Sequence, residues 1–142
     1  MAHPGDAVFH LMRRVLQDHG AVWQSKLPEL TKPQFAVLST VAATPDIDQV
    51  TVGARAAVDK ATLAGMLRRL EERGLITKTA DSVDRRRFLL RLTAKGKAVV
   101  RATTPLADDA DAQLLTRLTA TEQRQLRKLL LKLAAPDGAD TQ

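Results

Sequence analysis

The sequence predicts a mainly α-helical chain with one small two-stranded β-hairpin. Apolar residues make up 44% of the 142 residues, but aromatic residues make up only 3%. A core built from Leu, Val and Ala favours helix over sheet. Apolar side chains recur at helical spacing along most of the chain, whereas strict alternation between residues 76 and 92 is typical of strands.

Two helices are predicted before residue 45. One apolar stripe runs from about Asp6 to Leu27, which indicates a first helix. A second helix is expected to begin after the N-cap Thr31, with Pro33 in its first turn, where a missing N–H costs little. Pro45 ends this helix, and the stretch "TPDIDQ" that includes it is expected to be a loop.

Two further helices and the hairpin follow. A short helix is expected over residues 50–57, and a longer basic helix begins after the N-cap Asp59 and ends before Gly74. Alternating side chains at residues 76–80 and 88–92 indicate two strands, and the residues between them form the tip of a hairpin.

The last part of the chain is again expected to be helical. Thr93 caps a fifth helix. Pro105 is expected to kink this helix or shift its path, because proline removes a backbone hydrogen bond and pushes the chain aside. The pattern "TATE" at residues 119–122 is a capping box that begins a last, leucine-rich helix. Residues 136–142 are expected to form a disordered tail.

Positive charge is concentrated in the middle of the chain. The segment Arg55–Arg101 holds 13 Lys and Arg against 5 Asp and Glu, which is +8, whereas the remainder holds 9 against 11, which is −2. A localised basic surface indicates a polyanion as partner. The alternative is a generally basic surface that only keeps the chain soluble.

Several other classes of function are disfavoured. The chain has no cysteine, which excludes disulfides and thiolate metal sites and agrees with a reducing, cytoplasmic location. We find no Gly-rich phosphate loop or nucleophile elbow, and His10 and His19 are nine residues apart, too far for a helical metal pair. No enzyme activity, cofactor, metal site or membrane span is therefore expected.

The order of the elements indicates a winged helix-turn-helix. Two short helices joined by a tight turn, the second of them basic and capped, fit a helix-turn-helix, and the hairpin supplies the wing. A recognition helix fits the major groove of DNA. A hairpin tip beside it reaches the minor groove, where arginine is favoured because a narrow groove concentrates negative potential.

Three stretches resemble the multiple-antibiotic-resistance regulator (MarR) family. They are "LTKPQFAVLSTV", "VDKATLAGMLRRLEERGLI" and "DSVDRRRFLLRLTAKGKAVV", the last with an Asp-x-Arg tip and a following Leu-Thr-x-x-Gly. The resemblance implies a dimer held by N- and C-terminal helices. The implied domains are a dimerisation helix at 1–30, a DNA-binding domain at 31–100 and C-terminal dimerisation helices at 101–135.

The resemblance also implies DNA-binding residues in the wing. Arg86 is expected to enter the minor groove, and Asp84 is expected to hold it through a charge-assisted hydrogen bond. Arg85 and Arg87 are expected to contact phosphate or water instead of bases.

Further DNA contacts are implied in the recognition helix. Thr62 and Arg69 match positions that meet DNA in relatives, although Arg69 can instead pair with Glu72 on the helix surface. Ala64 and Gly65 stand where relatives often carry polar or basic residues, so DNA shape is expected to carry more of the selectivity. With the wing, the predicted DNA-binding set is Lys60, Thr62, Arg68, Arg69, Asp84, Arg85, Arg86 and Arg87.

A small-molecule effector is a further implication, because relatives often release DNA when a small aromatic acid binds beside the dimer helices. The candidate residues are His10, Arg14, His19 and Trp23. His19 and Trp23 lie one turn apart, where a cation or hydrogen-bond donor beside an indole can hold an aromatic carboxylate. The alternative is that Trp23 belongs to the dimer core and that His19 is only tolerated at the interface.

These observations predict a ligand-responsive transcriptional regulator that binds double-stranded DNA as a homodimer. We expect a repressor that leaves a pseudo-palindromic operator when a hydroxybenzoate- or hydroxynicotinate-like acid binds. The alternative is a winged-helix protein–protein interaction module without operator binding.

Overall fold

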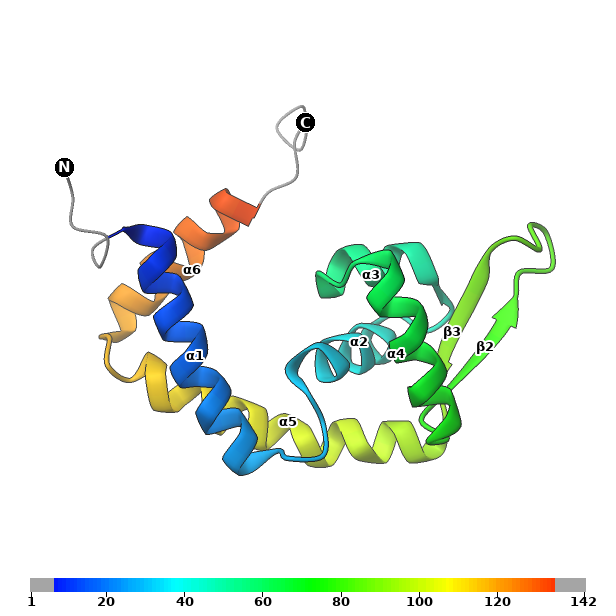
Figure 1. The fold of residues 1–142 in the computed structure, drawn as a ribbon, viewed down its shortest axis with the longest axis horizontal. Coiled ribbons are helices and arrows are strands. Elements are labelled where there is room, and N and C mark those ends of the chain that lie inside the picture. The colour runs from blue at the N-terminus through cyan, green and yellow to red at the C-terminus, as the bar shows by residue number, and fades with distance from the viewer. Residues whose placement is uncertain (1–6, 135–142) are drawn as a thin grey trace.

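The computed structural model describes residues 7–134, so the tail predicted at 136–142 lies outside the described residues. Figure 1 shows a mainly helical chain with a small sheet, which confirms the predicted fold class. The elements are α1 (Val8–Lys26), α2 (Lys32–Ala43), β1 (Ile47–Asp48), α3 (Gln49–Ala56), α4 (Lys60–Glu72), β2 (Ile76–Ala80), β3 (Phe88–Leu92), α5 (Ala94–Leu115) and α6 (Ala120–Ala134).

The elements form two parts joined by one long helix. Figure 1 shows α1 and α6 at one end, α2 to α4 with the sheet at the other, and α5 extending along both. The main core lies in the second part, where Leu38 of α2, Leu70 of α4 and Leu90 of β3 are completely buried. The helix-turn-helix and the hairpin therefore share one hydrophobic core.

The helix starts agree with the predicted caps. Thr31 and Gln34 form a reciprocal capping box at α2, and the hydroxyl of Thr93 accepts a hydrogen bond from the Gly96 N–H at 3.0 Å. Thr119 and Glu122 form a second capping box before α6. Such side chains satisfy N–H groups that have no partner within their own helix.

The sheet has three strands, so the expectation of a plain loop at residues 44–49 is wrong. Ile47 and Asp48 form β1, which pairs antiparallel with β3 opposite Leu90 and Leu89. Ile47 is buried in the main core. A two-residue strand has no alternation that could be recognised in the sequence, and it exists only because β3 lies beside it.

Pro105 lies inside α5, which runs from Ala94 to Leu115, so the proline does not end the helix. Its ring leaves the carbonyl of Arg101 without a helical N–H donor. Both residues are exposed, so water can solvate that carbonyl. On the buried side, Ala107 and Ala110 pack with Trp23 and Leu27, so the part of α5 after Pro105 is held against α1.

We predict that Gly96→Ala destabilises the protein strongly. A Cβ at this position would lie 2.0 Å from the carbonyl oxygen of Leu75, which itself accepts the N–H of Thr93. Because that contact is with backbone, the free energy of unfolding should fall by about 1–3 kcal/mol. Chemical denaturation followed by circular dichroism measures this change.

Gly20→Ala is the matched control, since a Cβ there would meet only the flexible end of Lys32 at 3.9 Å. This change should raise the free energy of unfolding by about 0.5–1 kcal/mol, because alanine favours the helical state. Equal effects of the two substitutions would contradict the close approach of α5 to Leu75.

Candidate nucleic-acid interface

The recognition helix α4 separates its buried residues from its cations. Leu63, Met66, Leu67 and Leu70 are buried in the core. The residues predicted to contact DNA, which are Lys60, Thr62, Arg68 and Arg69, are all exposed. The helical spacing of the apolar residues thus directs the four predicted side chains away from the core.

Thr62 has a structural role that the sequence did not reveal. Its backbone N–H and its hydroxyl donate to the two carboxylate oxygens of Asp59, at 2.9 and 2.8 Å. These hydrogen bonds, the backbone one first, lower the pKa of the Asp59 carboxyl. The hydroxyl oxygen of Thr62 keeps acceptor capacity, and the residue as a whole is exposed, so it can still contact a base.

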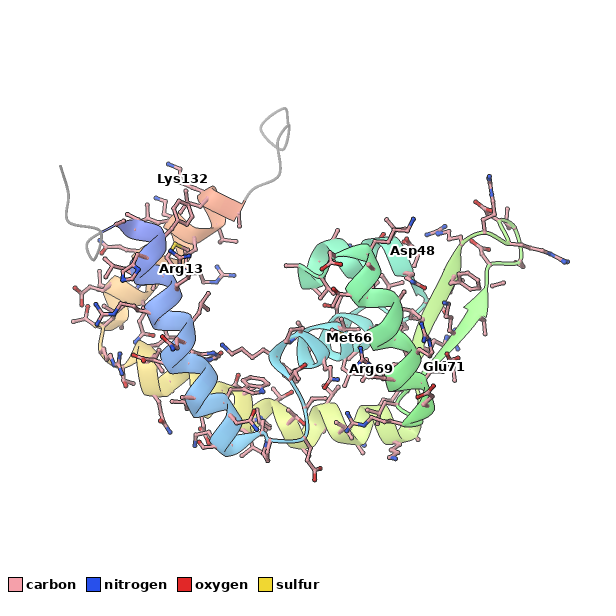
Figure 2. The ribbon with its side chains drawn as sticks, viewed as in Figure 1. Arg13, Asp48, Met66, Arg69, Glu71 and Lys132 are labelled. Carbon is pink, nitrogen blue, oxygen red and sulfur yellow. The ribbon has the colours of Figure 1, made fainter. Side chains whose placement is uncertain are left out.

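Arg69 lies along the surface of α4. Its Nε donates to the carbonyl of Gly65 at 3.3 Å, and a Cβ at Gly65 would come within 3.4 Å of its Nη2. Within residues 7–134 no ion pair joins Arg69 to Glu72, so the alternative pairing is not what the structure shows. Figure 2 labels Arg69, Met66 and Glu71 on this helix.

Two aspartates organise the tip of the wing. The Asp81 carboxylate accepts the Val83 N–H at 3.0 Å, and the Asp84 carboxylate accepts the Arg86 N–H at 3.1 Å. The Arg87 N–H also donates to the carbonyl of Asp84 at 3.0 Å. Aspartate favours such turns because its short side chain can accept N–H groups two residues ahead.

The three consecutive arginines of the wing have three different environments. The Nε of Arg86 lies 3.4 Å from Asp84, as the resemblance implies, while 94% of its side chain is exposed. Arg85 is exposed and has no hydrogen bond or ion pair through its side chain within the part of the chain that the structure describes. Figure 2 shows long basic side chains projecting from this end of the molecule.

Arg87, which the sequence predicts to contact phosphate or water, has two carboxylate partners within the chain. Its guanidinium lies 3.3 Å from Asp48 and 3.5 Å from Asp81, although half of the side chain is exposed. Asp48 also caps α3 by accepting the N–H and the hydroxyl of Thr51, at 3.2 and 2.5 Å. The base of the wing is thereby joined to the first helix of the helix-turn-helix.

The Asp48 carboxylate is stabilised in its ionised form. The hydroxyl of Thr51 lowers the pKa of this group most, and the backbone N–H of Thr51 and the guanidinium of Arg87 lower it further against the effect of burial. Asp48 is therefore charged at neutral pH, as its ion pair with Arg87 requires.

A second aspartate–arginine pair lies at the other end of β1, where Asp46 precedes the strand. Arg91 donates from Nε and Nη2 to the two oxygens of Asp46, both at 2.6 Å. This bidentate pair lowers the pKa of Asp46 and raises that of Arg91. It also holds Asp46 at a positive φ of 64°, a left-handed conformation that aspartate tolerates better than most residues.

The comparisons with known proteins agree with this geometry. Residues 30–88 match the MarR family. The transcriptional regulator HosA of Escherichia coli is 45% identical over 125 residues, which cover 88% of this chain and 93% of HosA. The chain belongs to the MarR family.

Two further MarR-family relatives cover nearly the whole chain. The transcriptional repressor NicR of Pseudomonas putida is 32% identical over 134 residues, which cover 93% of this chain and 85% of NicR. The structure of BpsR from Bordetella bronchiseptica, whose DNA binding is regulated by 6-hydroxynicotinic acid, superposes with a TM-score of 0.91 at 33% identity. This match covers 96% of the present chain and 99% of the BpsR chain.

The four residues predicted to bind an effector all lie on α1 of this MarR-family chain, but they differ in how deeply they are buried. Trp23 is buried, and its indole N–H donates to the carbonyl of Leu30 at 2.7 Å. His19 is mostly buried beside it and donates from Nε2 to Asp111 of α5 at 2.6 Å. His10 is half-buried, and Arg14 is exposed.

His19 and Trp23 thus already have partners within the chain. Trp23 packs against Phe35 and Ala110, so the core around it is formed by α1, α2 and α5 of one chain.

Residues 7–134 contain no cluster of three or more metal-ligating side chains and no helix long and apolar enough to span a membrane.

We predict that Arg87→Ala loosens the wing, whereas Arg85→Ala does not. Both substitutions remove one positive charge, but only Arg87 joins the hairpin to Asp48. The opening free energy of the amides between β1 and β3 should fall by about 0.2–1 kcal/mol in Arg87→Ala. Hydrogen exchange of the Asp46 and neighbouring amides measures this, and equal exchange in both variants would contradict the role of Arg87.

We also predict that Asp84→Ala weakens DNA binding roughly tenfold, because Asp84 holds both the backbone and the side chain of Arg86. Simple electrostatics predicts tighter DNA binding instead, since the change removes a negative charge beside DNA. Asp109→Ala, which removes an exposed carboxylate from α5, is the control and should leave affinity unchanged. Tighter DNA binding by Asp84→Ala in a fluorescence titration would refute this role.

Proposed function

We propose that the chain is a transcriptional repressor that binds DNA as a homodimer and releases it when a small aromatic acid binds. The observation that carries this proposal is the pairing of an exposed basic recognition helix with a wing whose tip holds Arg86 beside Asp84. In this arrangement α4 enters the major groove and Arg86 enters the adjacent minor groove.

The remaining cations of the interface contribute affinity more than sequence selectivity. Lys60, Arg68 and Arg85 are exposed, and phosphate contacts from such side chains position a protein on DNA without reading bases. Arg69 and Thr62 are the residues that we assign to base edges. Arg87 acts mainly by holding the wing, because its guanidinium already faces two carboxylates.

The dimer is proposed from the apolar surface of the terminal helices. α6 has no buried residue, although it carries five exposed leucines. Phe9 and Leu16 of α1 are also exposed, at 72% and 58%. Apolar residues gathered on such helices indicate an interface, and a second copy of the chain covers both helices symmetrically. Residues 1–30 and 101–135 therefore supply the proposed dimerisation helices.

The effector is proposed to bind beside α1, near the junction with the DNA-binding part. A cavity of about 580 Å³ lies there, between Leu16 of α1, Lys32 of α2, and Asp59 and Thr62 at the start of α4. A ligand in this place touches both the dimerisation helix and the cap of the recognition helix, which gives it a direct route to the DNA-binding residues.

The four predicted effector residues are not among those that line that cavity. We therefore assign them other roles in effector binding. Arg14 and the half-buried His10 lie on α1, where a second copy of the chain can complete a site with them. Trp23 and His19 support the effector site indirectly, because they hold α1 against α5. The likeness to BpsR, at 33% identity, supports a hydroxynicotinate-like acid.

Selection from random DNA duplexes tests the proposed function. The selected sites should be pseudo-palindromic, with half-sites about 10 bp apart, because a two-fold dimer presents two identical recognition helices. The logarithm of the binding constant should fall with the logarithm of salt concentration by about 0.9 per phosphate contacted. Arg69→Ala should cost roughly 1–3 kcal/mol of binding free energy.

The same titrations distinguish an operator-binding repressor from a protein–protein interaction module. Such a module would show no enriched sequence and no counterion-release slope, and either result would overturn operator binding. Adding 6-hydroxynicotinate or 4-hydroxybenzoate to the protein–DNA complex then tests release, and a complex that neither acid weakens would overturn the proposed effector class.

A further inference from the structure

A second hollow lies on the DNA-binding part, away from the wing tip and the recognition helix. It has a volume of about 540 Å³ and lies between the end of α2, strand β3 and the first half of α5. Its apolar wall is formed by Val41, Leu92 and Val100, and its basic residues are Arg91, Lys97 and Arg101. This size is within the range of small-molecule sites.

Two of the three cations have no side-chain partner in the part of the chain that the structure describes. Lys97 and Arg101 lie one turn apart on α5 and are exposed, and neither side chain has a hydrogen bond or ion pair within residues 7–134. Like charges at this spacing on a helix repel each other. An anion between them would remove that repulsion.

Arg91 is the third basic residue of the hollow, and the carboxylate beside it, that of Asp46, is already paired with Arg91 itself. Its bidentate pair with Asp46 neutralises that carboxylate and uses two of the five guanidinium N–H groups. The remaining N–H groups can still donate to a ligand.

We propose that this hollow binds an aliphatic carboxylate. The apolar wall takes the hydrocarbon body, and Lys97 and Arg101 take the carboxylate. None of the side chains that line the hollow is aromatic, so a planar ring gains no stacking there. The site is separate from the effector cavity beside α1, and it contacts both the strand that leaves the wing and the helix that leads to the dimerisation helices.

Hexanoate and its neutral counterpart 1-hexanol are the probes for this site. Each is titrated into the full-length protein while backbone amide NMR signals are recorded. Hexanoate should cause saturable shifts at Ala42, Leu92 and Val100, whereas hexanol should bind more weakly. Equal binding of the two compounds, or no saturable shift at these residues, would overturn the proposal.

The double variant Lys97→Ala/Arg101→Ala should weaken hexanoate binding roughly three- to tenfold, as expected for two exposed charge contacts. The control is Lys128→Ala/Lys132→Ala, which removes two exposed cations at the same spacing from α6 and should bind hexanoate like the unmodified protein. Amide spectra show whether each variant is folded. A folded Lys97→Ala/Arg101→Ala protein that binds hexanoate with unchanged affinity would overturn the proposal independently of DNA binding.

Discussion

The DNA-binding part depends on the central position of β3 in its sheet. This strand pairs with β1, which leads directly into α3, and with β2, which follows α4. It then continues through Thr93, whose N–H and hydroxyl bind the carbonyls of Leu75 and Gly74, into α5. The strand before the helix-turn-helix and the strand after it are therefore both hydrogen-bonded to β3. The wing and the recognition helix keep a fixed relation because Leu90, at the centre of β3, is completely buried in their common core.

The wing shows why local charge alone is a weak guide to function. Its three arginines carry the same charge, yet Arg87 faces Asp48 and Asp81, Arg86 is held by Asp84, and Arg85 extends into solvent. Burial and nearby carboxylates decide which guanidinium is available to a partner. The same rule applies on α5, where Lys97 and Arg101 are exposed and have no side-chain partner among residues 7–134, whereas Arg91 on the neighbouring strand is bound by Asp46.

α5 links the two parts of this MarR-family chain, and its contacts suggest how one part responds to the other. Its first turn lies against the carbonyl of Leu75, directly after the recognition helix, and Ala107 and Ala110 pack against Trp23 of α1. Trp23 in turn binds the carbonyl of Leu30 just before α2. A ligand or a second copy that shifts α1 therefore acts on a packed junction and not on a free helix. Packed junctions of this kind transmit movement because they resist gradual deformation.

The sequence by itself determined the features that depend on near neighbours. The helices and their caps at Thr31, Asp59 and Thr93, and the hairpin with its aspartate-rich tip, were predictable because their hydrogen bonds join residues within a few positions. Only the tertiary structure decided that β1 exists, that α5 continues through Pro105, and that Trp23 belongs to the core of a single chain. It also decided that Arg87 binds Asp48, which is 39 residues away. Each of these depends on a partner distant in the sequence, and composition and periodicity contain no information about which distant groups the packed core brings together.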